Sequence, residues 1–245
     1  NFLFGSSYRQ GSKEKGELSF FSQQQVDGLL ITSVVNSDYI ISYLEHSNIP
    51  TIFLSQWFEQ YEVDYVINDN FEGAFMVTDH LIKLGHTHIA HIMALDTQMS
   101  ARERLRGYKH APENAGIPAD NRLLRSGDST TESGYYLTKD LLQSGEKMRA
   151  LFAYNDVVAL GAFRAIKEAN LQVPSDISLI GYDDIMFAEF FEVPLTTIHQ
   201  PTIEISRKAA ELLFEKIKAG PDYKTQQVIL KPRLVVRSST SICPG

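Results

Sequence analysis

The feature of this sequence that most limits its fold is a repeated exchange of two patterns along the chain. Short apolar runs such as DGLLIT (27–32) and ALFAYN (150–155) are separated by stretches with apolar residues at helical spacing. One such stretch covers residues 71–84, and Gly85 follows it as a helix-ending glycine would. The other apolar runs that we expect to form strands lie at residues 2–7, 51–55, 64–69, 88–93, 122–128 and 177–183.

Continuous apolar strands that alternate with helices are typical of parallel sheets covered on both faces. We therefore expect an α/β fold with doubly wound parallel sheets. The alternation breaks at residues 94–101 and 199–202, and Gly and Pro interrupt residues 218–223. We interpret these three segments as crossovers between two lobes. The expected N-terminal lobe comprises residues 1–94 and 201–220, and the expected C-terminal lobe comprises residues 95–200 and 221–245.

Composition and charge narrow the classes of function. The chain of 245 residues is 43% hydrophobic and 22% charged, which is typical of a globular protein. Its formal net charge of −7 provides no overall basic field for nucleic acid, so DNA contact would need a part outside this sequence. The single cysteine, Cys243, allows no disulfide within the chain and fits the cytoplasm. No apolar run is long enough to span a membrane.

Polar residues follow several of the expected strands. Ligands of parallel α/β sheets collect beyond the carboxyl ends of the strands, because loops and helix N-termini converge there. Asn and Asp at such positions also cap the following helix, so each residue alone has a structural explanation. Four strand ends of this kind favour a binding site over capping alone. The residues at these ends are Ser55, Asp69 with Asn70, Asn155 with Asp156, and Asp183 with Asp184.

The sequence contains none of the motifs that would indicate an enzyme. There is no P-loop, no GxGxxG, no GxSxG and no metal-ligand spacing of His, Cys and carboxylates. We therefore expect a binding protein that is not an enzyme and has neither a cofactor nor a metal.

Several segments resemble, in their order along the chain, the regulatory core of the LacI/GalR (lactose-repressor) family of bacterial transcription factors. The resemblance implies two lobes of periplasmic-binding-protein type, a homodimer, and a small effector, most often a sugar, bound in the cleft between lobes. It also implies an operator read by a helix-turn-helix headpiece, which this sequence does not contain. The segments are VDGLLI, DNFEGAFMVTDHLIKLGHTHIAHI, ARERLRGY, GDSTTESGY, ALFAYNDVVALGAFRAIKEANLQVPSDISLIGYDDI, PLTTIHQP and LKPRLVVRSST.

Two points qualify this resemblance. Residues 1–30 are similar to the family's second strand, second helix and third strand, so its first core strand and helix have no counterpart and a gap in the first sheet is expected. A periplasmic sugar-binding protein of a transporter shares the two-lobed architecture and is the alternative. The ending LKPRLVVRSST and an aromatic segment at 187–191 favour the regulator.

The resemblance also implies effector contacts, carried over position by position. Arg104 would donate two hydrogen bonds to hydroxyls or a carboxylate, and Asp183 would accept from hydroxyls or an N–H group. Phe152 would stand at the cleft wall, although a phenylalanine within ALFAYN also fits the core. Gln98 stands where purine-responsive relatives carry arginine, which argues against a purine. The remaining expected contacts are Asn155, Ser55, Ser100, Ser129 and Thr202.

A last group of residues matches the dimer interface of the family's C-terminal lobe. Three phenylalanines within five residues, directly after a strand end, are explained better by a partner chain than by burial in the core. The expected interface residues are Leu160, Phe187, Phe190 and Phe191.

Overall fold

The computed structural model of the chain describes residues 2–7, 10–32, 38–58, 60–95, 99–118 and 120–244. The chain divides into two compact units, and the expected α/β class is confirmed. The boundaries differ from the expected ones, because residues 69–94 belong to unit 2 and residues 221–230 to unit 1. Unit 1 consists of Asn1–Asn68, Thr97–Met99 and Pro201–Leu230, and unit 2 of Asp69–Asp96, Ser100–Gln200 and Lys231–Gly245.

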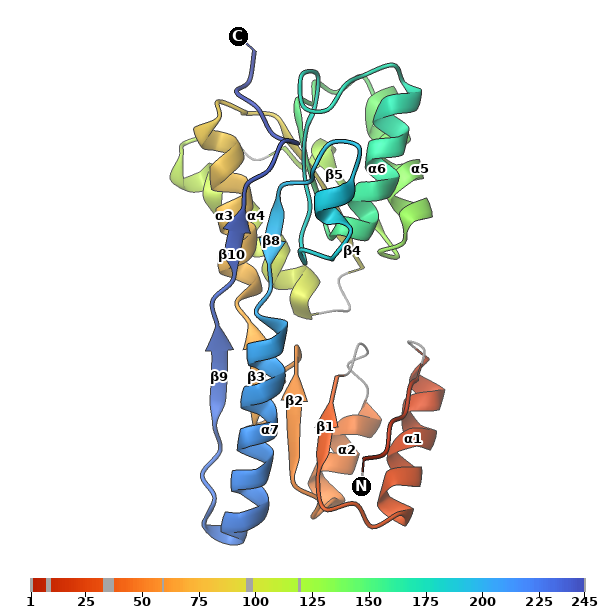
Figure 1. Cartoon of the computed structure of the whole chain (residues 1–245), viewed down its shortest axis with the longest axis vertical. Helices are drawn as coiled ribbons and strands as arrows, with labels where there is room; N and C mark the ends of the chain where they lie inside the picture. Colours follow the sequence, from red (N-terminus) through yellow and green to blue (C-terminus); the bar gives the residue numbers. More distant parts are fainter. Residues whose placement is uncertain are drawn as a thin grey trace. The chain divides into compact units, whose positions relative to one another are not determined.

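Unit 1 is built on a parallel sheet with the strand order β1-β2-β3-β9 (Figure 1). Because the strands are parallel, all of them end at the same edge of the sheet. The strands are β1 (Leu29–Ile31), β2 (Thr51–Leu54), β3 (Tyr65–Asn68) and β9 (Gln227–Leu230), and the helices are α1 (Gly11–Gln23), α2 (Asp38–His46), α7 (Thr202–Ala219) and the short 3₁₀ helix η3 (Gly220–Asp222).

Helices cover both faces of this sheet. Successive side chains of a strand point to opposite faces, so Ile52 and Phe53 of β2 enter different clusters. Phe53 packs in one cluster with Leu18 of α1 and Ile40 of α2. On the other face, Ile52 packs with buried residues of α7, including Leu212. This two-sided burial explains why β2 and β3 read as continuous apolar runs.

The N-terminal segment differs from the expectation. Residues 2–7 form no strand, so the strand expected there is wrong, and β1 is the outermost strand of the sheet order. A cavity of about 120 Å³ is lined by Gly5 and Ser7 on one side and by β1 and α1 on the other. Leu30 of β1 is 43% exposed, in contrast to the buried residues of β2. The cavity lies at the position where the resemblance anticipates a gap in the sheet.

Unit 2 contains a second parallel sheet with the order β5-β4-β6-β7 and an antiparallel pair of β8 with β10 (Figure 1). The strands are β4 (Ile89–Ala94), β5 (Leu124–Gly127), β6 (Ala150–Ala153), β7 (Ser178–Ile180), β8 (Thr197–His199) and β10 (Arg233–Val235). The helices are α3 (Asn70–Lys83), α4 (Met99–Asn114), α5 (Thr131–Gln143) and α6 (Asp156–Glu168), with 3₁₀ helices η1 (Asn121–Leu123) and η2 (Ala188–Phe190).

The two faces of the second sheet are also covered by helices. Leu151 of β6 packs in a cluster with residues of α5 and α6, and the next residue, Phe152, packs in a cluster with residues of α3 and α4. Helices α5 and α6 approach closely because a glycine stands at each contact. A Cβ at Gly134 would lie 2.2 Å from the carbonyl oxygen of Val158, and one at Gly161 would lie 1.9 Å from that of Thr131.

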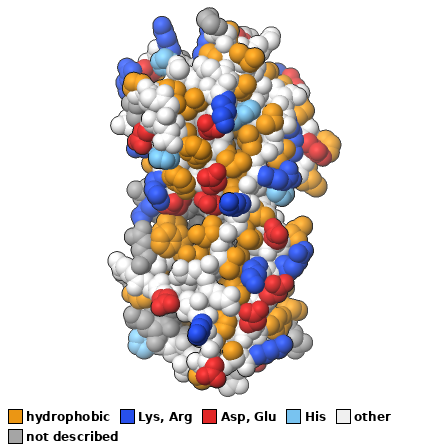
Figure 2. All heavy atoms as spheres, turned by 90° about the vertical axis from the view of Figure 1, so that its left-hand side faces the viewer, with side chains coloured by type: hydrophobic (Ala, Val, Ile, Leu, Met, Phe, Trp, Pro, Cys, Tyr) orange, Lys and Arg blue, Asp and Glu red, His pale blue; other side chains and the backbone are white. Residues whose placement is uncertain are grey.

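The surface carries charges of both signs. On the face drawn in Figure 2, acidic and basic side chains are interspersed among apolar ones, and the described residues form no large basic area there. Within the described ranges, no helix is both long enough and apolar enough to cross a lipid bilayer.

Candidate functional site

The polar centre of unit 2 is the guanidinium of Arg104, which α4 places beside the carboxyl edge of the second sheet. The residue is only 4% exposed. Its Nε donates to Asn70 Oδ1 at 2.9 Å, its Nη1 to the carbonyl oxygen of Tyr154 at 2.6 Å, and its Nη2 to Asp183 Oδ1 at 3.4 Å. A planar guanidinium can satisfy acceptors from several directions at once. Helix α3 and the ends of β6 and β7 thus meet at one side chain.

Two tyrosine rings flank the same guanidinium. The guanidinium carbon lies 3.6 Å from the centre of the Tyr182 ring and 4.5 Å from that of Tyr154, within the range of cation–π attraction. Burial alone would lower the pKa of Arg104, but Tyr154, Asp183 and Tyr182 together raise it above its usual value. The arginine is therefore a fixed positive charge.

Asp183 follows β7 and is the more accessible partner of this ion pair. Its side chain is 30% exposed, compared with 5% for that of Arg104. Gln200 Nε2 donates to Asp183 Oδ1 at 2.6 Å, the same oxygen that faces Arg104. Burial raises the pKa of Asp183, and the charge of Arg104 opposes this effect. The described side-chain contacts of Asp183 both end on Oδ1.

Asp184, the second aspartate of this strand end, is held by two other side chains. Its Oδ1 accepts from Arg237 Nη2 at 2.7 Å and its Oδ2 contacts His199 Nδ1 at 2.9 Å. Burial would raise the pKa of Asp184, but the bonds from Arg237 and His199 lower it below the usual value. The loop after β7 thus carries one carboxylate tied to β8 and the segment after β10, and one carboxylate accessible beside Arg104.

Three more predicted residues lie along the same edge of unit 2. Asn155 follows β6, and its Oδ1 caps α6 by accepting from Val158 N at 2.8 Å. Ser100, in the first turn of α4, lies 2.8 Å from the hydroxyl of Tyr154. Ser129 follows β5 with a φ of 67° and is 8% exposed. The helix cap thus fixes the orientation of the Asn155 amide at this edge.

The structure corrects the prediction for Phe152. This residue is 0% exposed, and its ring stacks on the imidazole of His91 with ring centres 4.4 Å apart. It lies in the middle of the cluster formed with α3 and α4. The apolar run ALFA is a central strand buried on both faces, so the phenylalanine is a core residue and offers no ring surface to a ligand.

The predicted contacts of unit 1 are less defined. Ser55 follows β2 with a φ of 59° and is exposed at the carboxyl edge of the first sheet. Thr202 is exposed in the first turn of α7. Gln98 lies outside the described residues.

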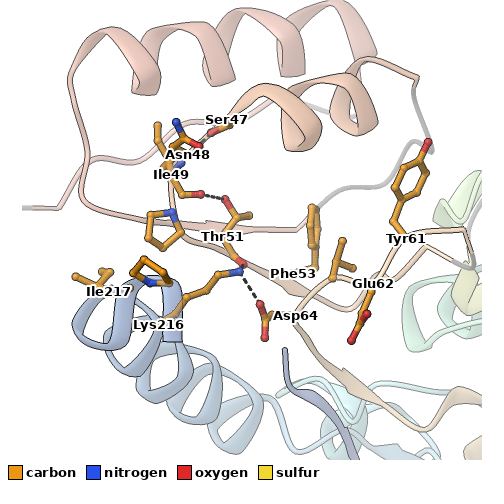
Figure 3. Close-up of a pocket in the computed structure, with 14 residues that line it drawn as sticks. Ser47, Asn48, Ile49, Thr51, Phe53, Tyr61, Glu62, Asp64, Lys216 and Ile217 are labelled. Atoms are coloured by element: carbon orange, nitrogen blue, oxygen red, sulfur yellow. Dashed lines mark hydrogen bonds and ion pairs between the residues drawn. The ribbon is translucent and has the colours of Figure 1, made fainter. Parts of the chain in front are cut away.

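Unit 1 also contains a cavity of about 580 Å³ that holds none of the predicted contacts (Figure 3). It lies at the start of β2, which is the edge of the sheet opposite to Ser55. Across it, Lys216 Nζ of α7 lies 2.6 Å from Asp64 Oδ2, and Asp64 Oδ1 accepts from Tyr223 and from the backbone of Gln226. Asp64 is 2% exposed and tied to these three donors. This network joins α7 and the start of β9 to the start of β3. Its contacts account for the buried charge of Asp64 by a structural role, without a ligand.

Sequence reasoning missed Tyr154, Tyr182 and Gln200. Each stands next to a residue of the predicted site or inside a predicted crossover: Tyr154 before Asn155, Tyr182 before Asp183, and Gln200 within 199–202. A tyrosine directly before two of the four polar strand ends, at Asn155 and at Asp183, was the available signal. In the part of the chain that the structure describes, no cluster of His, Cys, Asp and Glu could hold a metal ion.

The aromatic segment after Asp183 is largely exposed. The exposed fractions are 72% for Met186, 62% for Phe187, 72% for Phe190, and 47% for Leu160 on α6. Phe191 differs, because it is partly buried and packs against the core of unit 2. Its inclusion in the interface stays a prediction, with part of the side chain packed against unit 2.

Comparison with known proteins gives consistent matches. Residues 78–240 match the family described as periplasmic binding protein-like domain. The HTH-type transcriptional repressor PurR of Aliivibrio fischeri is 34% identical over 232 residues, which are 94% of this chain and 68% of that protein.

Solved structures of regulators are also similar. A LacI-family transcriptional regulator from Enterococcus faecium with bound ribose is 32% identical, with a TM-score of 0.85 over 99% of this chain and 88% of that one. The lac repressor dimer bound to operator and the anti-inducer ONPF is 29% identical, with a TM-score of 0.85 over 94% of this chain and 79% of that one.

Proposed function

Because this chain belongs to the LacI/GalR family of transcriptional regulators and forms an effector-binding core of that family, we propose that it senses a small hydroxylated molecule through Asp183 and Arg104. The relatives found are regulators, and no reaction is proposed for this chain. Operator binding would require a helix-turn-helix segment outside these 245 residues. The periplasmic transport protein is not favoured by these relatives.

The observation that carries the proposal is the unequal burial of the ion pair between Arg104 and Asp183. A carboxylate whose side chain is 30% exposed and which lies beside a fixed guanidinium can accept from a hydroxyl, and the charge of Arg104 opposes the rise that burial causes in the pKa of Asp183. Two neighbouring groups that donate or accept, the amide of Asn155 and the hydroxyl of Ser100, lie on the same edge. This combination suits the vicinal hydroxyls of a sugar.

A purine is the second candidate because the repressor PurR is among the relatives. Purine bases are held by stacking on aromatic rings as well as by hydrogen bonds. Here the Tyr182 and Tyr154 rings lie against Arg104 and are 0% and 6% exposed, and Phe152 is buried in the core. The described residues therefore support a sugar better than a purine. Ribose, which is bound to the Enterococcus faecium regulator, is the first sugar to try.

A ligand screen tests this proposal. Binding to the folded state raises the melting temperature, by an amount that grows with ligand concentration relative to Kd. The panel consists of ribose, cellobiose, a sugar phosphate, a nucleoside and a purine base at matched concentrations. We expect a shift with a sugar or sugar phosphate. A shift with the purine base alone would replace the sugar proposal by the purine one.

We also propose a two-fold symmetric dimer formed through the exposed apolar residues of unit 2. In a symmetric interface, the same patch of both copies is buried, so residues that are exposed in one chain cover their own copies or near neighbours. The lac repressor structure is a dimer, which supports the same arrangement for this chain. The proposed interface comprises the exposed Leu160, Met186, Phe187 and Phe190 and the partly buried Phe191.

A further inference from the structure

Asp156 is a buried carboxylate of unit 2 that the contacts proposed above do not include. It is the first residue of α6 and is 0% exposed. An aspartate in the first turn of a helix is ordinarily explained by the positive end of the helix dipole. Here both carboxylate oxygens accept hydrogen bonds from residues outside α6. Oδ1 accepts from Thr197 Oγ1 at 2.6 Å, and Oδ2 accepts from the backbone N of Ile185 at 2.9 Å.

These bonds hold the segment that carries Asp183. The backbone N of Asp156 donates to the carbonyl oxygen of Tyr182 at 2.9 Å, so Asp156 is bonded to residues on both sides of the aspartate pair. Asp183 and Asp184 have φ angles of 111° and 53°. Such angles are unfavourable for residues with a Cβ and persist only where the surroundings hold them. The bonds of Asp156 to Tyr182 and Ile185 supply part of this constraint.

The charges that face Asp156 are those of Asp183 and Asp184, and within the described ranges no ion pair joins it to a cation. Arg104 faces Asp183, while Arg237 and His199 face Asp184. Burial and the two neighbouring aspartates raise the pKa of Asp156 to about 7, against the hydrogen bonds from Thr197 and Ile185. The carboxylate therefore gains or loses its proton near neutral pH.

We propose that Asp156 is a positioning residue for effector binding: its ionised carboxylate holds Asp183 in place, and uptake of a proton loosens Asp183 and weakens the binding. The proposal rests on the proposed function, since Asp183 is the contact that it positions. A neutral carboxyl group is a weaker acceptor than a carboxylate, so both bonds lose strength on protonation. Effector affinity should then fall as the pH falls from about 8 to about 6, by at most about tenfold per pH unit for one proton.

The first experiment needs no effector. Backbone amide resonances of Asp183 and Ile185 are followed by NMR between pH 5.5 and 8.5. In the wild type, both resonances should shift with one shared inflection near pH 7. In Asp156→Asn, which keeps the shape and removes the charge, that inflection should disappear. Resonances that stay flat in the wild type, or that titrate equally in both proteins, overturn the proposal.

Two further variants distinguish the titration of Asp156 from that of a nearby histidine. His199→Gln replaces the side chain that contacts Asp184, and the inflection should remain if it belongs to Asp156. Thr197→Val removes one donor to the carboxylate, and because that bond favours the ionised form, the inflection should move to higher pH. An inflection that vanishes in His199→Gln, or does not move in Thr197→Val, contradicts the assignment. Thr197→Val also keeps the proposal testable if Asp156→Asn does not fold.

The second experiment measures ribose affinity by calorimetry at pH 6 and pH 8. We expect weaker binding at pH 6 in the wild type and equal binding at both pH values in Asp156→Asn. Equal pH dependence in the two proteins would overturn the role of Asp156 in binding. If ribose binds at neither pH, ribose is excluded as the effector, while the NMR titration still decides whether Asp156 positions Asp183.

Discussion

Arg104 and Asp183 form an ion pair in which Nη2 lies 3.4 Å from Oδ1, and the two partners differ in what else they do. Arg104 bonds to Asn70 and Tyr154 as well and is almost fully buried. Asp183 is partly exposed, and its two described side-chain contacts both involve Oδ1. The arginine thus links three elements of unit 2, whereas the aspartate is the more accessible member of the pair.

Arg104→Met should therefore lower stability as well as binding. It leaves the acceptors on Asn70, Tyr154 and Asp183 without their donor, and we expect the free energy of unfolding to fall by about 2–4 kcal/mol. Urea unfolding measures this change. The control is Arg106→Ala, whose side chain is 65% exposed and pairs with Glu103 one turn away. Its effect should stay below about 0.5 kcal/mol, and equal effects of the two variants would contradict the buried role of Arg104.

The proposed dimer depends on Phe187 and Phe190, which are 62% and 72% exposed. Burying each ring contributes about 1.5–3 kcal/mol, so replacing both by glutamate should abolish association. A dimer with a binding free energy of about −8 kcal/mol has a Kd of about 1 µM and is largely associated at about 10 µM protein. Sedimentation equilibrium at that concentration should give a dimer for the wild type and a monomer for the double variant. Phe214→Glu is the control, because Phe214 is 58% exposed on α7 of unit 1. A monomeric wild type, or a monomeric control, would contradict the interface.

The close contact of α5 and α6 makes Gly161 sensitive to any side chain. Gly161→Ala places a Cβ 1.9 Å from the carbonyl oxygen of Thr131, a backbone atom that moves only with its helix. We expect overpacking to cost about 1–3 kcal/mol in thermal or urea unfolding. Gly16→Ala, in α1 with no atom within 4 Å of its Cβ, should instead stabilise by about 0.5–1 kcal/mol through helix propensity. Destabilisation by both variants would exclude the steric explanation.

Two buried groups of unit 2 give opposite pH dependences. Burial lowers the pKa of His91 to about 4, so only the unfolded chain binds its proton between pH 6.5 and 4, and stability falls by about 3 kcal/mol as the pH falls through that range. The pKa of Asp156 is raised to about 7, so between pH 7 and pH 4 the folded state binds this proton and the unfolded chain does not. Stability therefore rises by about 4 kcal/mol as the pH falls from 7 to 4.

Differences between variants and wild type isolate these effects. The stability of His91→Phe relative to the wild type should increase as the pH falls from 6.5 to 4, and that of Asp156→Asn should decrease as the pH falls from 7 to 4. Urea unfolding at half-unit pH steps measures both. Parallel curves for a variant and the wild type would show that the substituted group does not titrate differently on folding.

Much of the fold follows from the pattern of apolar runs. The strands expected within 27–32, 51–55, 64–69, 88–93, 122–128, 150–155 and 177–183 are all present as β1 to β7. Parallel strands buried on both faces produce long apolar runs, and this signal is strong. In contrast, β9 and β10 contain no fully buried residue, and β8 has a single apolar residue between Thr197 and His199, so these strands lack the two-sided burial that produces a long apolar run.

The errors have physical reasons too. The run FLFGSS has the composition of a strand, but Phe2 and Phe4 are 86% and 93% exposed because no sheet neighbour lies beside them. The expected lobe boundary at residue 94 was wrong, because β4 belongs to unit 2. A strand buried on both faces has the same apolar pattern in either sheet, so the sequence of β4 does not show which sheet it joins. Pairing depends on contacts distant in sequence, and β4 pairs with β5 and β6.

The candidate site was predicted in part. Polar residues at strand ends identified Asp183 and Asn155, and the resemblance added Arg104. The sequence could not show whether Phe152 is a core residue or a residue at the wall of a site, because both are apolar residues within an apolar run. The bonds of Asp156 to Thr197 and Ile185 join residues 29 to 41 positions apart, and no local pattern indicates them.

The central claim is that Asp183 receives the effector, and calorimetric titration of the wild type and Asp183→Asn tests it most directly. The titrant is the probe that gives the largest thermal shift in the panel, measured at pH 8. Loss of a hydrogen bond to a charged group costs about 1.5–3 kcal/mol, so Asp183→Asn should bind about 10- to 150-fold more weakly, with Ile203→Ala, at an exposed position of α7, as the unchanged control. Equal affinity of Asp183→Asn and the wild type would contradict the account.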